Sequence, residues 1–73
     1  MVLHGCAPGA RVRLTHVTVP AGERLRLAEL GFVRGAELRV LGRGATGGLF
    51  VGLGDARIAL DTATAHDLHV SHA

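Results

Sequence analysis

The sequence predicts a mainly β fold: a small barrel of about five short strands, with one short helix inserted between the first and second strands. Three observations predict it. Short stretches of alternating apolar and polar residues recur along the chain, turn signals separate them at regular spacing, and only one longer stretch is rich in helix formers. The chain has 73 residues, 48% of them hydrophobic and 19% charged. One domain is therefore expected over residues 1–73.

The first expected strand is RVRLTHVTV, residues 11–19. The apolar residues of its first half, Val12 and Leu14, share one face, whereas those of its second half have the opposite parity. A strand alternates with a period of two, so this slip predicts a bulge or bend near Thr15 or His16. Such bends curve short strands into small barrels.

A short helix is expected over ERLRLAEL, residues 23–30, after a Pro-Ala-Gly break. Gly31 stands where a left-handed C-terminal cap needs glycine. At roughly 100° per residue, Leu27 and Leu30 lie on one side and Leu25 points away from both. A helix this short needs tertiary packing. We therefore expect the Leu27 and Leu30 face to pack on the sheet and Leu25 to lie near solvent.

The rest of the chain is predicted to form strands and turns. Further strands are expected at AELRVLGR, LFVGL, RIAL and DLHV, with these residues facing inward: Leu38, Val40, Leu49, Val51, Leu53, Ile58, Leu60, Leu68 and Val70. Gly54-Asp55 suits a tight hairpin turn, and Asp61 suits the N-cap of one helical turn. The last two or three residues are expected to form a tail.

Composition bears on location. The single cysteine, Cys6, cannot form an internal disulfide, so the fold needs no oxidising compartment. The N-terminus shows no signal sequence, and no apolar run approaches the roughly 20 residues that cross a bilayer. We therefore expect a cytoplasmic protein without direct membrane insertion.

Charge argues against a nucleic-acid partner. All eight basic residues are arginines, they form no run, and the net charge is only +2. An outward-facing basic face is conceivable from Arg11, Arg13, Arg39 and Arg57. Single-stranded nucleic acids, however, usually stack on aromatic side chains, and the chain has only Phe32 and Phe50. No nucleic-acid partner is expected.

Catalytic residues are equally hard to find. Cys6 and Ser71 are the only cysteine and serine, and each lies near a terminus where no rigid scaffold would hold a base against it. The loop GRGATGG, residues 42–48, lacks the Gly-Lys-Ser/Thr ending of a phosphate-binding loop and joins strand to strand. We expect a hairpin connection there and no enzyme.

The candidate metal ligands of the chain are its histidines and its cysteine. His4 and Cys6 are weak candidates, because two ligands are too few for a closed zinc site. Adventitious or intersubunit binding there stays open, against a flexible end with a partly buried thiol. His66, His69 and His72 recur every third residue, but on a strand His69 points opposite to the other two. We expect solvent-exposed histidines, no metal site and no cofactor.

Several motifs resemble the FeoA family. RLAELGF at residues 26–32, followed by Gly35 and LRVL at 38–41, resembles its RLxxLG…G…V.VL signature. Its opening and closing motifs are similar to the following residues: Pro8-Gly9 and Val12, then Ile58-Ala59-Leu60, Ala65, Leu68 and Val70. The likeness covers nearly the whole chain in order.

The resemblance implies an SH3-like barrel and a non-catalytic role as the cytosolic accessory protein of the ferrous iron transporter FeoB, acting on that transporter's cytosolic region. Related barrels form the C-terminal domains of iron- and manganese-dependent repressors, so a regulatory domain that senses a metal or ligand is the alternative. A chain that starts at its own Met1, without preceding DNA-binding helices, favours the accessory protein. Self-association through exposed strand edges stays open.

The expected partner surface is the helix and the loop that follows it. Leu25 is apolar yet faces solvent, Arg24 and Arg26 flank it, and Phe32 and Arg34 come just after the cap. An exposed leucine with arginines and an aromatic residue is typical of an interface hot spot. The alternative is that Leu25 or Phe32 covers the open end of the barrel.

Overall fold

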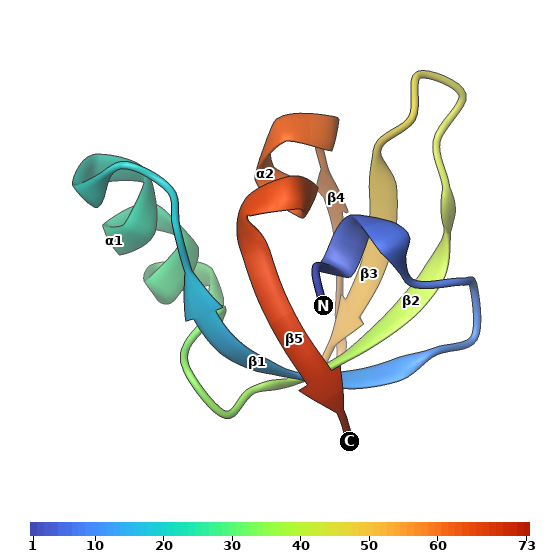
Figure 1. Cartoon of the computed structure of the whole chain (residues 1–73), viewed down its shortest axis with the longest axis horizontal. Helices are drawn as coiled ribbons and strands as arrows, with labels where there is room; N and C mark the ends of the chain where they lie inside the picture. Colours follow the sequence, from blue (N-terminus) through green and yellow to red (C-terminus); the bar gives the residue numbers. More distant parts are fainter.

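The β strands form one antiparallel sheet that curls into a barrel in the computed structural model, which describes residues 1–73 (Figure 1). The strands are β1 (Arg11–Val17), β2 (Glu37–Arg43), β3 (Leu49–Leu53), β4 (Ala56–Leu60) and β5 (Leu68–His72), in the order β4-β3-β2-β1-β5. A 3₁₀ helix, η1 (Leu3–Gly5), precedes them, α1 (Ala21–Leu30) lies between β1 and β2, and α2 (Thr62–Asp67) precedes β5. The predicted fold class is confirmed. None of these helices has the length and apolar character needed to span a membrane.

The bulge predicted in β1 is present. The register between β1 and β5 shifts between Leu14 and His16, which leaves Thr15 without a partner in the ladder. The Thr15 hydroxyl instead donates a hydrogen bond to the carbonyl of His69 at 3.0 Å. The extra residue increases the local twist, so β1 pairs with β2 through its first residues and continues alongside β5.

The helix α1 ends at Gly31 as predicted. Gly31 has a φ of 106°, in the left-handed region, and the N–H of Phe32 donates to the carbonyl of Leu27 at 2.9 Å. A Cβ at Gly31 would also lie 2.9 Å from Cδ2 of Leu53. Glycine is therefore needed here both for the backbone conformation and for the close approach to β3.

The predicted buried face of α1 is only half right. Leu27 is buried, whereas Leu30 is 51% exposed. The reason is that the chain reverses at Gly31 and inserts Phe32, 2% exposed, into the core. One leucine and one phenylalanine anchor the helix, so Leu30 is left in solvent.

One cluster of apolar side chains fills the barrel. The inward-facing residues of the strands belong to it as predicted, except that Leu53 and Ile58 are only partly buried at its margin. The 15 buried members are Leu3, Cys6, Val12, Leu14, Val19, Leu27, Phe32, Leu38, Val40, Leu49, Val51, Leu60, Ala65, Leu68 and Val70.

Both ends of the chain are more ordered than the sequence indicated. Leu3 is fully buried and η1 packs against α2 and β5, so the N-terminal segment is not a flexible end (Figure 1). The N–H of Val70 donates to the carbonyl of Met1 at 2.8 Å. At the other terminus Ser71 and His72 pair with β1 instead of forming a tail. Long-range pairing overrides local composition at both ends.

The predicted turns are confirmed. The loop after β2 is a hairpin connection, closed by the N–H of Gly44 donating to the carbonyl of Gly48 at 2.8 Å. The β3–β4 turn has Gly54 at a φ of 58°. Asp61 caps α2, because its Oδ1 accepts from the N–H of Thr64 at 2.7 Å.

We expect Leu3→Ala to lower the free energy of unfolding by about 2–5 kcal/mol, because it leaves a cavity in the core next to α2 and β5. Urea denaturation followed by circular dichroism measures this loss. Leu41→Ala is the matched control, since Leu41 is 41% exposed and should change stability by no more than about 0.5 kcal/mol. If Leu3→Ala lowered the free energy of unfolding as little as Leu41→Ala does, η1 would contribute nothing to the core.

Asp61 should make stability depend on pH in the acid range. Hydrogen bonds from Thr64, first from its side chain and then from its backbone N–H, hold the pKa of Asp61 below its usual 3.8. A lowered folded-state pKa means that the cap stabilises the protein above the unfolded-state pKa, and that this contribution is lost as pH falls through the folded-state value. The melting temperature of Asp61→Ala should therefore lie below that of the unsubstituted chain at neutral pH and converge with it as pH falls through the lowered folded-state pKa of Asp61. Asp61→Asn caps the helix without titrating. The difference in melting temperature between Asp61→Asn and Asp61→Ala should therefore persist at acid pH. If this difference also disappears as pH falls, the explanation is wrong.

Candidate partner-binding surface

A groove of about 420 Å³ lies between the end of β1 and the helix α1. Figure 1 shows α1 standing beside the end of β1, joined to it by a short connection. The strand forms one wall, and α1 with the loop after it forms the other. The residues that line the groove are Thr15, His16, Val17, Arg24, Ala28, Phe32, Val33 and Arg34.

Phe32 lies at the bottom of this groove and is not an exposed contact residue. Its exposed fraction is 2%, which corrects the expectation that Phe32 lies on the surface with Leu25. The alternative reading, in which Phe32 covers the barrel, fits the structure. Because the chain turns back at Gly31, the ring packs into the core and also belongs to the lining of the groove.

Leu25 is exposed as expected, at 65%. On a helix it lies about 60° around the axis from Ala28, which lines the groove, so Leu25 stands at the rim of the α1 wall. Leu30 is also exposed but points to a different side of the helix. Val33, 48% exposed, adds an apolar surface on the loop side.

The groove carries positive charge that no acidic residue neutralises. Arg24 and Arg34 line it, and both ion pairs of the structure use Glu37 elsewhere. Arg26, the other arginine beside Leu25, does not line the groove, and its charge helps to lower the pKa of Asp61 instead. Apolar walls between free arginines can accept an apolar side chain that is accompanied by carboxylates.

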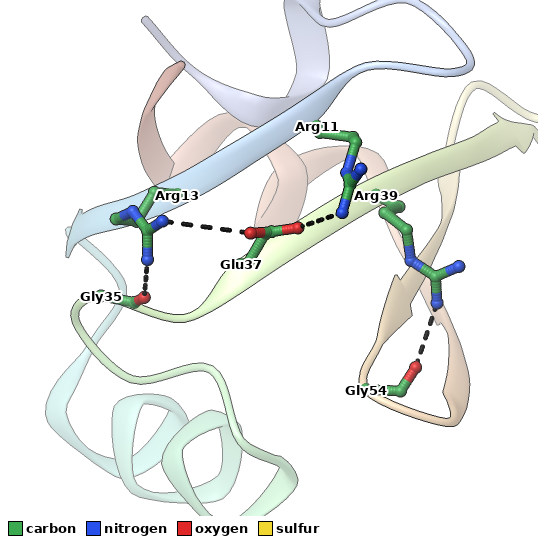
Figure 2. A network of polar contacts seen from close by, with 6 residues as sticks. All are labelled: Arg11, Arg13, Gly35, Glu37, Arg39 and Gly54. Atoms are coloured by element: carbon green, nitrogen blue, oxygen red, sulfur yellow. Dashed lines mark hydrogen bonds and ion pairs between the residues drawn. The ribbon is translucent and has the colours of Figure 1, made fainter. Parts of the chain in front are cut away.

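By contrast, arginines on the outer face of the sheet form ion pairs and hydrogen bonds within the protein. Figure 2 shows Arg11 and Arg13 on either side of Glu37, with nitrogen–oxygen distances of 2.9 and 3.9 Å. Arg13 also donates to the carbonyl of Gly35 at 3.0 Å, and Arg39 donates to the carbonyl of Gly54 at 3.0 Å. These side chains hold loops and strands together, so this face is not a free basic stripe.

The structure does not bring His4 and Cys6 together as metal ligands. The Cys6 thiol is buried, with Met1 Sδ at 4.0 Å and the Val2 carbonyl at 3.7 Å. The His4 ring instead stacks on His66, with ring centroids 4.1 Å apart. No group of three or more His, Cys, Asp or Glu side chains is placed to hold a metal ion.

A second histidine pair joins neighbouring strands. His16 of β1 and His69 of β5 stack with centroids 4.1 Å apart. His66 and His72 are exposed as expected, whereas His69 is only half-exposed. Sequence spacing could not show the His16–His69 pair, because it depends on which strands become neighbours.

A comparison of the sequence with models of protein families gives a match over nearly the whole chain. The model of the FeoA domain matches residues 1–72. The chain belongs to the FeoA family. No curated protein sequence matched it significantly.

Solved FeoA structures share the barrel of this FeoA-family chain. FeoA from Chlorobium tepidum is 30% identical, with a TM-score of 0.92 over 99% of this chain and 70% of that one. FeoA from Stenotrophomonas maltophilia, complexed with zinc, is 33% identical, with a TM-score of 0.81 over 97% and 89% of the two chains. That protein is described as a prokaryotic SH3 domain protein with a suggested role as a ferrous iron transport activating factor. The SH3-like architecture implied by the motifs is thus confirmed.

Metal-dependent repressors contain a similar fold. A manganese-dependent transcriptional repressor is 24% identical, with a TM-score of 0.87 over 100% of this chain and 41% of that one. At this identity the likeness concerns the fold alone.

We expect Leu25→Asp and Phe32→Ala to differ in their effect on stability, because Leu25 is exposed and Phe32 is buried. Leu25→Asp should lower the free energy of unfolding of the FeoA-family chain by no more than about 1 kcal/mol, because it changes an exposed helix position. Phe32→Ala should lower it by about 3–5 kcal/mol, because it empties a core site. Urea denaturation measures both. A large loss in Leu25→Asp would place Leu25 in the core instead.

Proposed function

We propose that this FeoA-family chain is a non-catalytic accessory protein of ferrous iron uptake that acts by binding the cytosolic region of a FeoB-type transporter. The observation that carries the proposal is the groove, whose lining combines apolar residues with Arg24 and Arg34, and the exposed Leu25 beside it. Family membership supports the connection with ferrous iron transport. A cytoplasmic location follows from this choice of partner.

The surface has the features of a protein-binding site. Exposed apolar residues beside arginines are enriched in interface hot spots, which form around pockets that exclude water on binding. The groove is open, and the buried Phe32 belongs to its lining. The unpaired charges of Arg24 and Arg34 would steer an acidic segment toward it.

The absence of a catalytic role is supported by the placement of the nucleophiles. The Cys6 thiol is buried among core residues, and its contacts are Met1 and Val2, neither of which is a base. Ser71 is exposed on β5, a strand end with no side-chain hydrogen bond to a histidine. Nucleophilic catalysis requires a base within hydrogen-bond reach of the nucleophile.

We expect the purified chain to bind the purified cytosolic region of the FeoB encoded in the same genome, and Leu25→Asp to weaken binding at least about tenfold. Arg34→Glu should weaken it as well, with a smaller salt dependence of the remaining affinity, because one steering charge is reversed. Isothermal titration calorimetry measures the Kd in the nucleotide-free, GDP-bound and GTP-bound forms of the transporter domain.

Leu41→Asp is the control for this experiment, since Leu41 is an exposed leucine of β2 that does not line the groove. Binding that survives Leu25→Asp but fails in Leu41→Asp would move the interface to the outer face of the sheet. No binding in any nucleotide state would refute the transporter as the partner.

A further inference from the structure

The strand β4 is an open edge of the sheet. It pairs with β3 on one side, and no strand lies on its other side. The edge of β5 is covered, because Val2 forms a bridge with His69 and the N–H of Val70 donates to the carbonyl of Met1 at 2.8 Å. An uncovered edge offers a row of backbone donors and acceptors to another chain. β4 is therefore the place where the barrel can accept a further strand.

The register of the hairpin determines which backbone groups of β4 point outward. β3 and β4 are joined by a two-residue turn, which the pair Leu53 and Ala56 closes. In such a hairpin the closing pair exchanges hydrogen bonds, and successive residues then bond alternately to one neighbouring strand and to the other. Ala56 and Ile58 therefore bond to β3. The N–H and carbonyl groups of Arg57 and Ala59 point away from it, and both residues are exposed.

Arg57 is the arginine of the strands that has no partner in the fold. The others all donate hydrogen bonds within the chain: Arg11, Arg13, Arg39 and Arg43. Arg57 is exposed and forms neither an ion pair nor a side-chain hydrogen bond. Its guanidinium therefore keeps all its donors for a carboxylate outside the chain.

A pocket of about 230 Å³ lies farther along the same hairpin. Its lining includes the half-exposed ring of Phe50, Ala59 directly opposite that ring, and Asp61 at the end of β4. The backbone of Asp61 is extended, so this residue continues the line of the strand. Arg26 acts on Asp61 through its charge but forms no ion pair with it. A guanidinium can stack on an aromatic ring and pair with a carboxylate, and this pocket offers both.

We propose that two copies of this chain pair through β4 in antiparallel orientation, with Arg57 of each copy bound beside Phe50 and Asp61 of the other. The two-fold axis passes between the two Ala59 residues, whose outward N–H and carbonyl groups bond to each other. In this register Arg57 lies directly opposite Asp61 of the second copy, because both are two residues from Ala59. The short side chain of Ala59 leaves the pocket open to the incoming arginine.

Charge selects this register over its neighbours. Opposite charges that face each other stabilise a pair of strands, and like charges destabilise it. A pairing centred on Arg57 sets two guanidinium groups against each other, and a pairing centred on Ile58 sets Asp55 opposite Asp61. The pairing centred on Ala59 instead joins opposite charges twice.

The same segment, residues 55–61, supplies both the arginine and the carboxylate, which is why the expected occupant is a second copy of the chain. A two-fold axis uses each contact twice and closes the assembly at a dimer. The contact is small, so the dimer should be transient and should form at high protein concentration.

The test is sedimentation equilibrium of the 73-residue chain at loading concentrations from about 10 μM to about 1 mM, because a transient dimer depends on protomer concentration. We expect a monomer–dimer equilibrium. Arg57→Glu should weaken it at least about tenfold, because it sets carboxylates against each other at both ends of the contact. Arg34→Glu is the matched control: it makes the same change of charge in the groove, away from β4, and should leave the dimerisation constant unchanged.

An exchange of charges tests the register. Asp61→Arg alone should also weaken self-association, because two guanidinium groups then face each other. A mixture of Arg57→Glu with Asp61→Arg should form a heterodimer, since each cross-strand pair again joins opposite charges. Amide hydrogen exchange of Ala59 should slow at high protein concentration, because its N–H has a partner only in the dimer.

Three results would overturn the proposal: a chain that stays monomeric over this range, an unchanged equilibrium in Arg57→Glu, or slowed exchange on β5 instead of at Ala59. Circular dichroism checks that each variant is folded. If Asp61→Arg, which lacks the cap of α2, does not fold, Arg57→Glu and the exchange of Ala59 decide. Binding of FeoB through the groove is a separate question, because no residue of β4 lines the groove.

Discussion

The one-residue bulge at Thr15 is the constraint on which the rest of this fold depends. β1 is the strand between β2 and β5, and apolar residues of both its halves must reach the core. A regular strand cannot do this, because Val12 and the partly buried Val17 have opposite parity in a strict alternation of two. The bulge moves the residues that follow it to the opposite face of the strand, and it also bends the strand. It closes one side of the barrel and turns the chain toward α1.

A second turn, at Gly31 and Phe32, determines the shape of the exposed surface. Because Gly31 is left-handed, the chain leaves α1 toward the barrel and Phe32 fills a core position beside Leu27. Leu27 and Phe32 thus fix the helix to the core, and the helix stands beside the end of β1. The groove is the space that results, and its apolar walls and free arginines follow from which helix residues are left uncovered.

The groove and the His16–His69 pair share the end of β1. His16 lines the groove and stacks on His69, so the bulge positions both features with one backbone irregularity. Family membership connects the chain with ferrous iron transport, and the FeoA structures show that the barrel is common to the family. The arginines of the groove and the stacked histidines are side chains that this particular sequence places on that barrel.

Sequence alone determined the strands, the helix, the bulge and the caps of this protein, because each is coded by neighbouring residues. The parity slip around Thr15, Gly31 after the helix and Asp61 before α2 are local signals of local hydrogen bonding and backbone geometry. Which side chains become neighbours was decided only by the tertiary structure. The exposure of Leu30, the burial of Leu3 and the His16–His69 pair all depend on contacts between residues distant in the sequence. Burial and pairing are properties of the assembled barrel, and a one-dimensional pattern does not specify which strand a residue will meet.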